Sequence, residues 1–270
     1  MKYLNLITVL TVLLVACNQP ATQESTESTE AQEPSREFYQ LKTYEFKSDE
    51  QVQRTDAYLG NAFIPALHKL GIQNVGVFKN IPIENNTSRL TYVLIPFNSL
   101  DQFEGLEAQL VTDQVYQQAG SDYINAAYDN APYQRIQSTV LKAFVDMPQM
   151  QPTPLTGPRL DRVYELRSYE SATEAIHINK VDMFNAGGEV ALFKKLEFNA
   201  VFYARVISGS TMPNLMYMTT FSDMASRVEH WPTFLTDPAW EAMKVNPKYQ
   251  QKNVSKNVTK FLYPTAYSDY

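Results

Sequence analysis

An internal repeat limits the possible folds of this chain more than any other feature of its sequence. Phe38–Glu45 (FYQLKTYE) matches Val163–Glu170 (VYELRSYE), 125 residues further on. Leu110–Tyr116 (LVTDQVY) matches Phe234–Trp240 (FLTDPAW), 124 residues further on. The repeated units of solenoid proteins are only a few tens of residues long, so a repeat of this length predicts two copies of a domain.

The first copy, residues 37–147, alternates between strand and helix patterns. Runs of aromatic and β-branched residues predict strands, and apolar residues at every third or fourth position predict helices. The predicted elements are a strand at Phe38–Phe46, a helix through Leu59–Leu70, strands at Asn74–Phe78 and Leu90–Ile95, helices at Ser99–Leu110 and after Asp113, and a strand at Ile136–Val145. Pro96 is expected to end the third strand. The resulting order, β-α-β-β-α-β, is that of a ferredoxin-like plait.

The second copy, residues 161–270, gives the same order. Its predicted strands are Arg162–Tyr169, Ala200–Ile207, Leu215–Phe221 and Asn257–Tyr263, and its helices are Glu174–Leu196 and Met224–Phe234. Gly187 and Gly188 are expected to break the first helix. Asp237 and Pro238 predict an N-cap and the first position of a further short helix. The proline-rich residues 148–160 predict a linker between the copies.

We therefore predict an α+β protein made of two tandem ferredoxin-like plaits. In such a plait the two helices cover one face of an antiparallel sheet, and the other face also needs a cover. The two sheets can meet each other, or each can meet a copy in a second chain. Both are forms of the dimeric α/β-barrel arrangement, and the sequence leaves both open.

The start of the chain predicts export and lipidation. Leu4–Ala16 is largely apolar and follows Lys2. This run is shorter than the roughly 20 residues that span a membrane, and it fits the hydrophobic region of a signal peptide at residues 1–16. Leu14–Cys17 resembles the lipobox of bacterial lipoproteins, which implies cleavage before Cys17 and acylation of that residue. An ordinary secretory signal with an incidental cysteine is the alternative.

The segment that follows predicts a tether. Residues 17–36 lack aromatic side chains and are rich in Ser, Thr, Gln and Glu, so they cannot bury enough surface to offset the entropy of ordering. Two or more acyl chains give stable membrane attachment. We therefore expect an exported protein anchored to a bacterial envelope membrane, at the periplasmic face or the cell surface. The net charge of −6 argues against nucleic acid as a partner.

Several segments of the second copy resemble the NIPSNAP family. They are VYELRSY at 163–169, MFN at 183–185, ALFKKL at 191–196, MPNLMYMTTF at 212–221, HW at 230–231, DPAW at 237–240 and YPTAYSD at 263–269. The resemblance is strong over residues 161–270 and weaker over 37–147. It implies dimeric α/β-barrel domains, and we expect a homodimer. It implies no catalytic residues and no cofactor.

Charged and phenolic side chains of the second copy predict a pocket. Strand alternation places Glu165, Arg167 and Tyr169 on one face, and Tyr203 and Arg205 on one face of the next strand. The full set of candidates is Glu165, Arg167, Tyr169, Tyr203, Arg205, Tyr217 and His230. If the apolar side of the sheet meets the helices, the strand residues of this set line the inside of the barrel. Arginines there could bind an anionic or carbonyl oxygen while Glu165 or a tyrosine handles a proton.

Each candidate also has a structural alternative. Glu165 and Arg167 can pair with partners across the sheet or an interface. His230 can be a packing or exposed residue rather than a general base. In the first copy the positions equivalent to Glu165, Arg167 and Tyr169 hold Gln40, Lys42 and Tyr44, so the carboxylate is missing. Any site is therefore expected to be better formed in the second copy.

Known catalytic and metal-binding motifs do not match. The three histidines, His68, His177 and His230, are far apart in the sequence and predict no metal site. No phosphate-binding loop and no GxSxG motif occur. We expect a non-catalytic module for small-ligand binding or assembly. The alternative is a cofactor-independent enzyme, oxygenase-like or isomerase-like, that acts on a small carbonyl or aromatic substrate in the second copy.

Overall fold

The structure, a computed structural model, describes residues 35–82, 88–249 and 252–270. The predicted signal peptide, Cys17 and all but the last two residues of the predicted tether lie outside these ranges. Among the helices of the described residues, none combines the length and the apolar character needed to cross a membrane.

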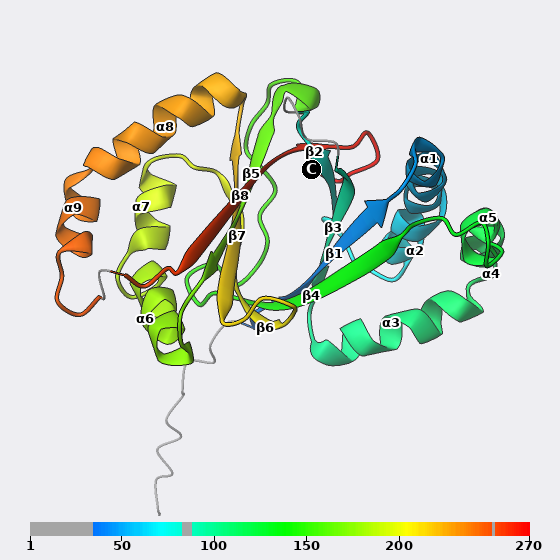
Figure 1. Ribbon diagram of the computed structural model, residues 1–270, viewed down its shortest axis with the longest axis horizontal. Helices are drawn as coiled ribbons and strands as arrows, with labels where there is room; N and C mark the ends of the chain where they lie inside the picture. The colour runs from blue at the N-terminus through cyan, green and yellow to red at the C-terminus, as the bar shows by residue number, and fades with distance from the viewer. Residues whose placement is uncertain (1–34, 83–87, 250–251) are drawn as a thin grey trace, which may run out of the picture. The chain divides into compact units, whose positions relative to one another are not determined.

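The described strands and helices form two similar halves (Figure 1). The first half contains β1 (Phe38–Phe46), α1 (Asp49–Tyr58), the π-helical η1 (Leu59–Phe63), α2 (Ile64–Lys69), β2 (Gly76–Asn80), β3 (Arg89–Phe97), α3 (Leu100–Thr112), α4 (Gln114–Ala119), α5 (Ser121–Ile124) and β4 (Arg135–Ala143). The second half contains the 3-10 helix η2 (Arg159–Asp161), β5 (Val163–Glu170), α6 (Glu174–Phe184), α7 (Glu189–Lys195), β6 (Ala200–Ser208), β7 (Asn214–Phe221), α8 (Met224–Thr236), α9 (Pro238–Lys244) and β8 (Lys256–Pro264). Both halves have the predicted order of strands and helices.

The strands form one closed antiparallel barrel with the order β1-β3-β2-β8-β5-β7-β6-β4. Each half contributes four adjacent strands. The halves join where β2 pairs with β8 and where β4 pairs with β6. Of the two arrangements that the sequence left open, the structure has the two sheets meeting within one chain. In Figure 1, helices α1–α5 lie to the right of the strands and α6–α9 to the left.

The interior of the barrel is a packed apolar core. Its residues alternate along the strands with those that face the helices. They include Tyr39, Leu41, Phe78, Tyr92, Leu94, Leu141, Tyr164, Leu166, Phe202, Met218 and Leu262. The barrel wall is therefore buried on both faces.

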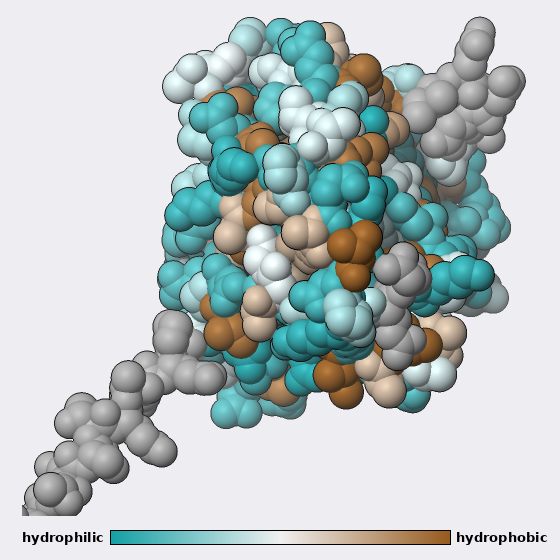
Figure 2. All heavy atoms as spheres, turned by 90° about the vertical axis from the view of Figure 1, so that its left-hand side faces the viewer, coloured by the Kyte–Doolittle hydropathy of each residue, from teal (hydrophilic) through white to brown (hydrophobic). Residues whose placement is uncertain are grey.

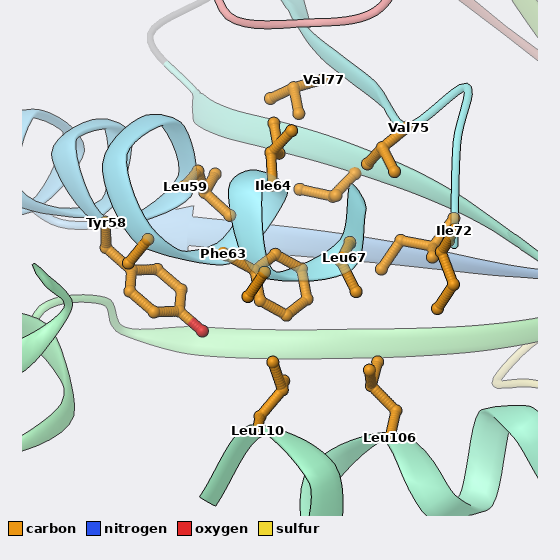
Figure 3. Packing of buried hydrophobic residues seen from close by; sticks show 14 of the residues in the cluster. Tyr58, Leu59, Phe63, Ile64, Leu67, Ile72, Val75, Val77, Leu106 and Leu110 are labelled. Atoms are coloured by element: carbon orange, nitrogen blue, oxygen red, sulfur yellow. The ribbon is translucent and has the colours of Figure 1, made fainter. Parts of the chain in front are cut away.

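A second type of core lies between the sheet and the helices of each half. In the first half, Leu106 and Leu110 of α3 point toward Phe63 and Leu67 (Figure 3). In the second half, aromatic side chains dominate this core, with Phe184, Phe193, Phe198, Tyr217 and Phe234 all buried. On the outer surface seen from the side of α6–α9, hydrophobic residues are scattered among hydrophilic ones (Figure 2).

The repeated Thr-Asp segment begins a short helix in both halves. Asp113 caps α4 and Asp237 caps α9, each by accepting hydrogen bonds from the backbone of its helix. The N-cap predicted at Asp237 is confirmed. Each carboxylate also pairs with a lysine from the helix of the preceding βα unit, Lys69 to Asp113 at 2.8 Å and Lys195 to Asp237 at 2.7 Å. These lysines lower the pKa of both aspartates.

The predicted break between α6 and α7 is confirmed. Gly188 has a φ of +89°, a left-handed conformation that favours glycine. A Cβ atom on Gly187 would lie 2.4 Å from the carbonyl oxygen of Met183, so only glycine fits there. These two residues let the chain turn between α6 and α7.

The end predicted for the third strand is wrong, because β3 continues through Pro96 to Phe97. Pro96 pairs with Tyr39 of β1. The pairing of β3 with β2, on the other side, ends at Leu94. Pro96 therefore lies beyond the part of β3 that has strands on both sides, and a strand tolerates proline there.

Candidate functional site

The structure brings together five of the seven residues that the sequence assigned to a pocket. These five, Glu165, Arg167, Tyr169, Tyr203 and Tyr217, lie between the sheet of the second half and its helices. Arg205 is exposed on β6. His230 lies on α8, donates a hydrogen bond from Nδ1 to the carbonyl oxygen of Ser226 at 2.7 Å, and packs edge-on against Phe198 and Phe221. Arg205 and His230 are therefore not part of the cluster.

The expected position of these residues inside the barrel is wrong. Their strand neighbours Tyr164 and Leu166 face the barrel interior, and Glu165 and Arg167 face α8. A closed barrel buries both faces of its strands, so the alternation of polar and apolar residues does not reveal which face the helices cover. The polar face lies under α8 because α8 supplies its hydrogen-bond partners.

Glu165 is fully buried, and both of its carboxylate oxygens accept hydrogen bonds. Arg227 of α8 donates from Nε to Oε2 and from Nη2 to Oε1, each at 2.9 Å. Trp231 donates from its indole nitrogen to Oε2 at 2.9 Å. Nη1 of Arg167 lies 3.5 Å from Oε1. A bidentate arginine is among the strongest partners of a carboxylate, so Glu165 is held in place and not exposed to a substrate.

Aromatic rings complete this cluster, which we call the second-half network. The Arg167 guanidinium lies 4.3 Å from the ring centroid of Trp231 and 5.3 Å from that of Tyr169. The hydroxyls of Tyr169 and Tyr217 are hydrogen-bonded at 2.8 Å. Burial raises the pKa of Tyr169 to about 12 and raises that of Tyr217 as well. Both phenols are therefore neutral at physiological pH and are poor general bases.

A further buried ion pair lies beside the network. Lys180 of α6 and Glu189 of α7 are 2.8 Å apart, and their side chains are 4% and 2% exposed. The Lys180 ammonium also lies 4.7 Å from the ring centroid of Phe184. Sequence reasoning missed these two residues and Arg227. The four-residue spacing of Arg227 and Trp231 indicates one helix face, but the sequence does not show which strand this face meets.

The equivalent space in the first half has an open pocket, and a glutamate stands where the second half has the large side chain of Trp231. At the repeat offsets, Gln40 replaces Glu165, Lys42 replaces Arg167, Phe103 replaces Arg227 and Glu107 replaces Trp231. A cavity of about 380 Å³ opens there between the sheet and α3, and we call it the first-half pocket. It is lined by these four residues together with Tyr58, Tyr116 and four others. Sequence reasoning placed the better-formed site in the second half, whereas this pocket lies in the first.

Lys42 is the positive group of the first-half pocket. Its ammonium lies 5.2 Å from the ring centroid of Phe63 and 5.5 Å from that of Tyr44. Among the described residues, no carboxylate forms an ion pair with it. Tyr58 and Tyr116 share a hydrogen bond of 2.8 Å on another wall. The pocket therefore offers a half-buried ammonium and aromatic rings to a ligand, and the exposed side chains of Glu104 and Glu107 also line it.

One residue of the second-half network also borders an open cavity. Tyr203 contributes to a hollow of about 580 Å³ between the linker, α7 and β6, which is also lined by Pro148, Pro152 and Val190. Its hydroxyl has no hydrogen-bond partner in the described part of the chain.

With respect to metals, no group of three or more His, Cys, Asp or Glu side chains within the described ranges could hold an ion.

Comparison with known families identifies the second half. The NIPSNAP family model matches residues 164–269. The second half carries a NIPSNAP domain. This match confirms the resemblance predicted for residues 161–270, and the NIPSNAP domain includes every residue of the second-half network. Comparison with curated proteins gives no match.

Solved structures with the same fold cover nearly the whole barrel. A candidate monooxygenase from Fusobacterium nucleatum is 9% identical, with a TM-score of 0.53, over 86% of this chain and 93% of its own. A candidate monooxygenase from Lactobacillus acidophilus is 10% identical, with a TM-score of 0.54, over 85% of this chain and 94% of its own. An anthrone oxidase-like protein is 10% identical, with a TM-score of 0.51, over 86% of this chain and 92% of its own. At such identities the likeness shows the fold alone.

Proposed function

We propose that this protein is a non-catalytic module that binds a small ligand in the first-half pocket and is held at a bacterial envelope membrane by a lipid on Cys17. The supporting observation is the difference between equivalent spaces in the two halves. The first-half pocket is open around Lys42, which has no ion-pair partner among the described residues, whereas the second-half network fills its own space. The two halves are, in this proposal, tandem ferredoxin-like plaits whose barrel closes within one chain.

The chemistry of the pocket indicates the kind of ligand. Lys42 favours an anionic or carbonyl oxygen, and Phe63, Tyr58 and Phe103 favour an apolar or aromatic body. Pockets for small molecules commonly combine such apolar walls with a few polar groups. A small aromatic or aliphatic compound with one oxygen acceptor meets these conditions.

The enzymatic alternative has less support. It needs a group in the second half that can transfer a proton, and Glu165 was the carboxylate available for that role. Arg227 and Trp231 occupy both oxygens of Glu165, which is fully buried. The structural neighbours described as oxidising enzymes are only 9–10% identical, so their chemistry adds no support.

A metabolite screen by thermal unfolding tests ligand binding, with Glu107→Trp as the variant that blocks the pocket. This change places a tryptophan where the second half has Trp231. The matched control is Gln109→Trp on the exposed side of the same helix. A ligand at 100 times its dissociation constant should add about 2.7 kcal/mol to the stability of the wild type and of the control, and nothing to Glu107→Trp.

Two outcomes would contradict the proposal. A compound that stabilises Glu107→Trp as much as the wild type would bind elsewhere. Conversion of a stabilising compound into a product, followed by mass spectrometry, would favour the enzymatic alternative.

Membrane attachment has its own test, because it does not depend on the pocket. Cys17→Ser should move the protein from the membrane fraction to the soluble fraction without detergent, since it removes the acylated side chain. The matched control is Ser25→Ala in the predicted tether, which should stay with the membrane. Membrane retention of a Cys17→Ser chain that has lost residues 1–16 would rule out a lipid on Cys17 as the anchor.

The proposal includes a homodimer. The barrel already closes within one chain, so a second chain would contact its outer surface and is not needed to complete the sheet. Light scattering of the purified Cys17→Ser chain should give twice the chain mass of 30.8 kDa. A monomeric mass at micromolar concentration would remove this part of the proposal and leave ligand binding unaffected.

A further inference from the structure

One end of the barrel contains a cavity that is separate from the first-half pocket. It has a volume of about 430 Å³, and we call it the barrel mouth. Its lining includes the apolar residues Leu41, Leu90, Leu166, Met216 and Val258 and the polar residues Ser168, Asn214 and Lys260. Leu41 and Leu166 also belong to the packed interior core, so the cavity leads down to an apolar floor.

Lys260 is the unusual residue of the barrel mouth. It lies on β8 opposite Leu166 of β5 and is half-buried. Its ammonium lies 5.6 Å from the ring centroid of Tyr92. No described carboxylate forms an ion pair with it. Burial lowers its pKa, which agrees with a charge that has lost water and gained no counter-ion.

The other lysine of the barrel mouth is neutralised. Lys256 is the first residue of β8, four residues before Lys260, and is exposed at the rim. Its ammonium is 3.2 Å from the Glu170 carboxylate. The two lysines share one strand and one face, so they form a matched pair in which one has a counter-ion and the other lacks one.

Polar groups on the neighbouring strands β5 and β7 are already satisfied. Asn214 is 1% exposed and donates a hydrogen bond to the Ser168 hydroxyl at 2.9 Å and to the Thr211 hydroxyl at 3.1 Å. These groups therefore make the wall polar without requiring a ligand. Two charged side chains of this cavity lack an ion-pair partner among the described residues: Lys260, which is half-buried, and Glu45, which is exposed.

We propose that the barrel mouth binds an amphiphilic organic monocarboxylate, with its carboxylate on Lys260 and its apolar chain against Leu41, Leu166 and Met216. One ammonium matches one negative charge, whereas a phosphate group is commonly held by an arginine fork or several backbone N–H groups. The five apolar lining residues can hold an apolar body beside the more numerous polar ones, and the volume lies within the range of small-ligand sites. This site is independent of the proposed function, because the two cavities share no lining residue.

Calorimetric titration with decanoate tests this site, and decanol and acetate serve as probes that lack the charge or the chain. The full chain with Cys17→Ser avoids the need for detergent. Decanoate should bind with saturation, and Lys260→Met should weaken it about ten-fold or more because a charge-assisted contact is lost. Lys256→Met is the matched control and should bind decanoate within about two-fold of the parent chain.

A second variant gives an independent test of the site if Lys260→Met does not fold. Met216→Trp fills the barrel mouth without changing its charge and should also abolish decanoate binding. The proposal fails if decanoate does not saturate, if Lys260→Met binds as well as the parent chain, or if decanol binds as tightly as decanoate. Loss of decanoate binding in Glu107→Trp instead of Met216→Trp would move the ligand to the first-half pocket. That result would overturn the barrel-mouth site and support the proposed function.

Discussion

The two halves of the barrel have the same framework but differ in the space beneath their helices. Both have the same order of elements, and both pair a helix-end lysine with the aspartate that caps the next short helix. Beneath α8 of the second half, Glu165, Arg227 and Trp231 form a closed network. Beneath α3 of the first half, where Glu107 stands in place of a tryptophan, there is a pocket of about 380 Å³. A few side chains therefore decide whether one framework holds a network or a cavity.

Buried charges make the second half sensitive to substitution. Moving an ion from water into a protein interior costs several kcal/mol, and the partner offsets this cost only while the pair is intact. Removal of one partner then leaves a buried charge without compensation. Lys42 of the first half is half-buried beside a cavity, so water can replace what a substitution removes.

The two halves should differ most in how much stability is lost when a positive charge is removed, in Arg227→Met of the second half and in Lys42→Met of the first. Arg227→Met leaves Glu165 buried without its bidentate partner and should lower the free energy of unfolding by about 3–5 kcal/mol. Lys42→Met should change it by less than about 1 kcal/mol. Urea denaturation of both variants measures these values.

The double variant Glu165→Leu/Arg227→Met sharpens this test. It removes both charges of the bidentate pair but leaves Arg167 beside an apolar side chain, so it should recover only part of the stability lost in Arg227→Met. Equal stability of Arg227→Met and the wild type would show that Glu165 does not depend on Arg227.

A smaller loss is expected for Trp231→Phe. Phenylalanine keeps an aromatic ring beneath Arg167 but cannot donate the hydrogen bond to Glu165. A hydrogen bond to a charged group contributes about 1.5–3 kcal/mol, and urea denaturation should show a loss in this range. Trp240→Phe on α9 is the matched control, and it should cost less because Glu165 keeps all its partners. An equal loss in both variants would mean that ring size, not the hydrogen bond, is responsible.

The pH dependence of stability should also differ between the halves. Burial, followed by the charge of Arg205, lowers the pKa of His177 below its usual 6.5. The unfolded chain then binds more protons than the folded chain, so stability is complete above pH 6.5 and falls as the pH decreases below it. The equivalent position of the first half holds Val52. His177→Val should reduce the pH dependence of the free energy of unfolding below pH 6.5, by at most about 1.4 kcal/mol per pH unit. An unchanged slope between pH 7 and 5 would contradict this assignment.

The smallest effect is expected when the missing carboxylate is placed in the first half. Gln40→Glu puts a negative charge beside Lys42 in a cavity that water can enter, and such pairs contribute about 0–1 kcal/mol. Thermal and urea unfolding should therefore change little. A loss of more than about 3 kcal/mol would indicate that the first-half pocket excludes water as the second half does.

Much of the framework could be predicted from the sequence, because it depends on local patterns. The apolar periodicity located the helices, and Gly188 and Asp237 marked where α6–α7 and α8–α9 are divided. The repeat predicted that both halves would have the same order. Whether the two sheets would meet within one chain or between chains could not be read from these local signals.

The candidate site was harder to predict, for two physical reasons. A closed barrel buries both strand faces, so the polar face of β5 gave no sign that it lay under helices. The partner of Glu165 is Arg227, 62 residues away, and helical spacing alone cannot assign such a contact. A cavity also depends on the combined size of Gln40, Lys42, Phe103 and Glu107, and this is a property of packing, not of any motif.

Competitive acetylation of lysines in the native protein, followed by mass spectrometry, tests the contrast between the halves most directly. Lys42 should react, because its ammonium lies in an open pocket, and Lys180 should stay unmodified until the protein unfolds, because its side chain is 4% exposed and paired with Glu189. A ligand found by the metabolite screen should protect Lys42 from the reagent. Equal protection of Lys42 and Lys180 in the absence of ligand would contradict an open pocket in the first half and a filled one in the second.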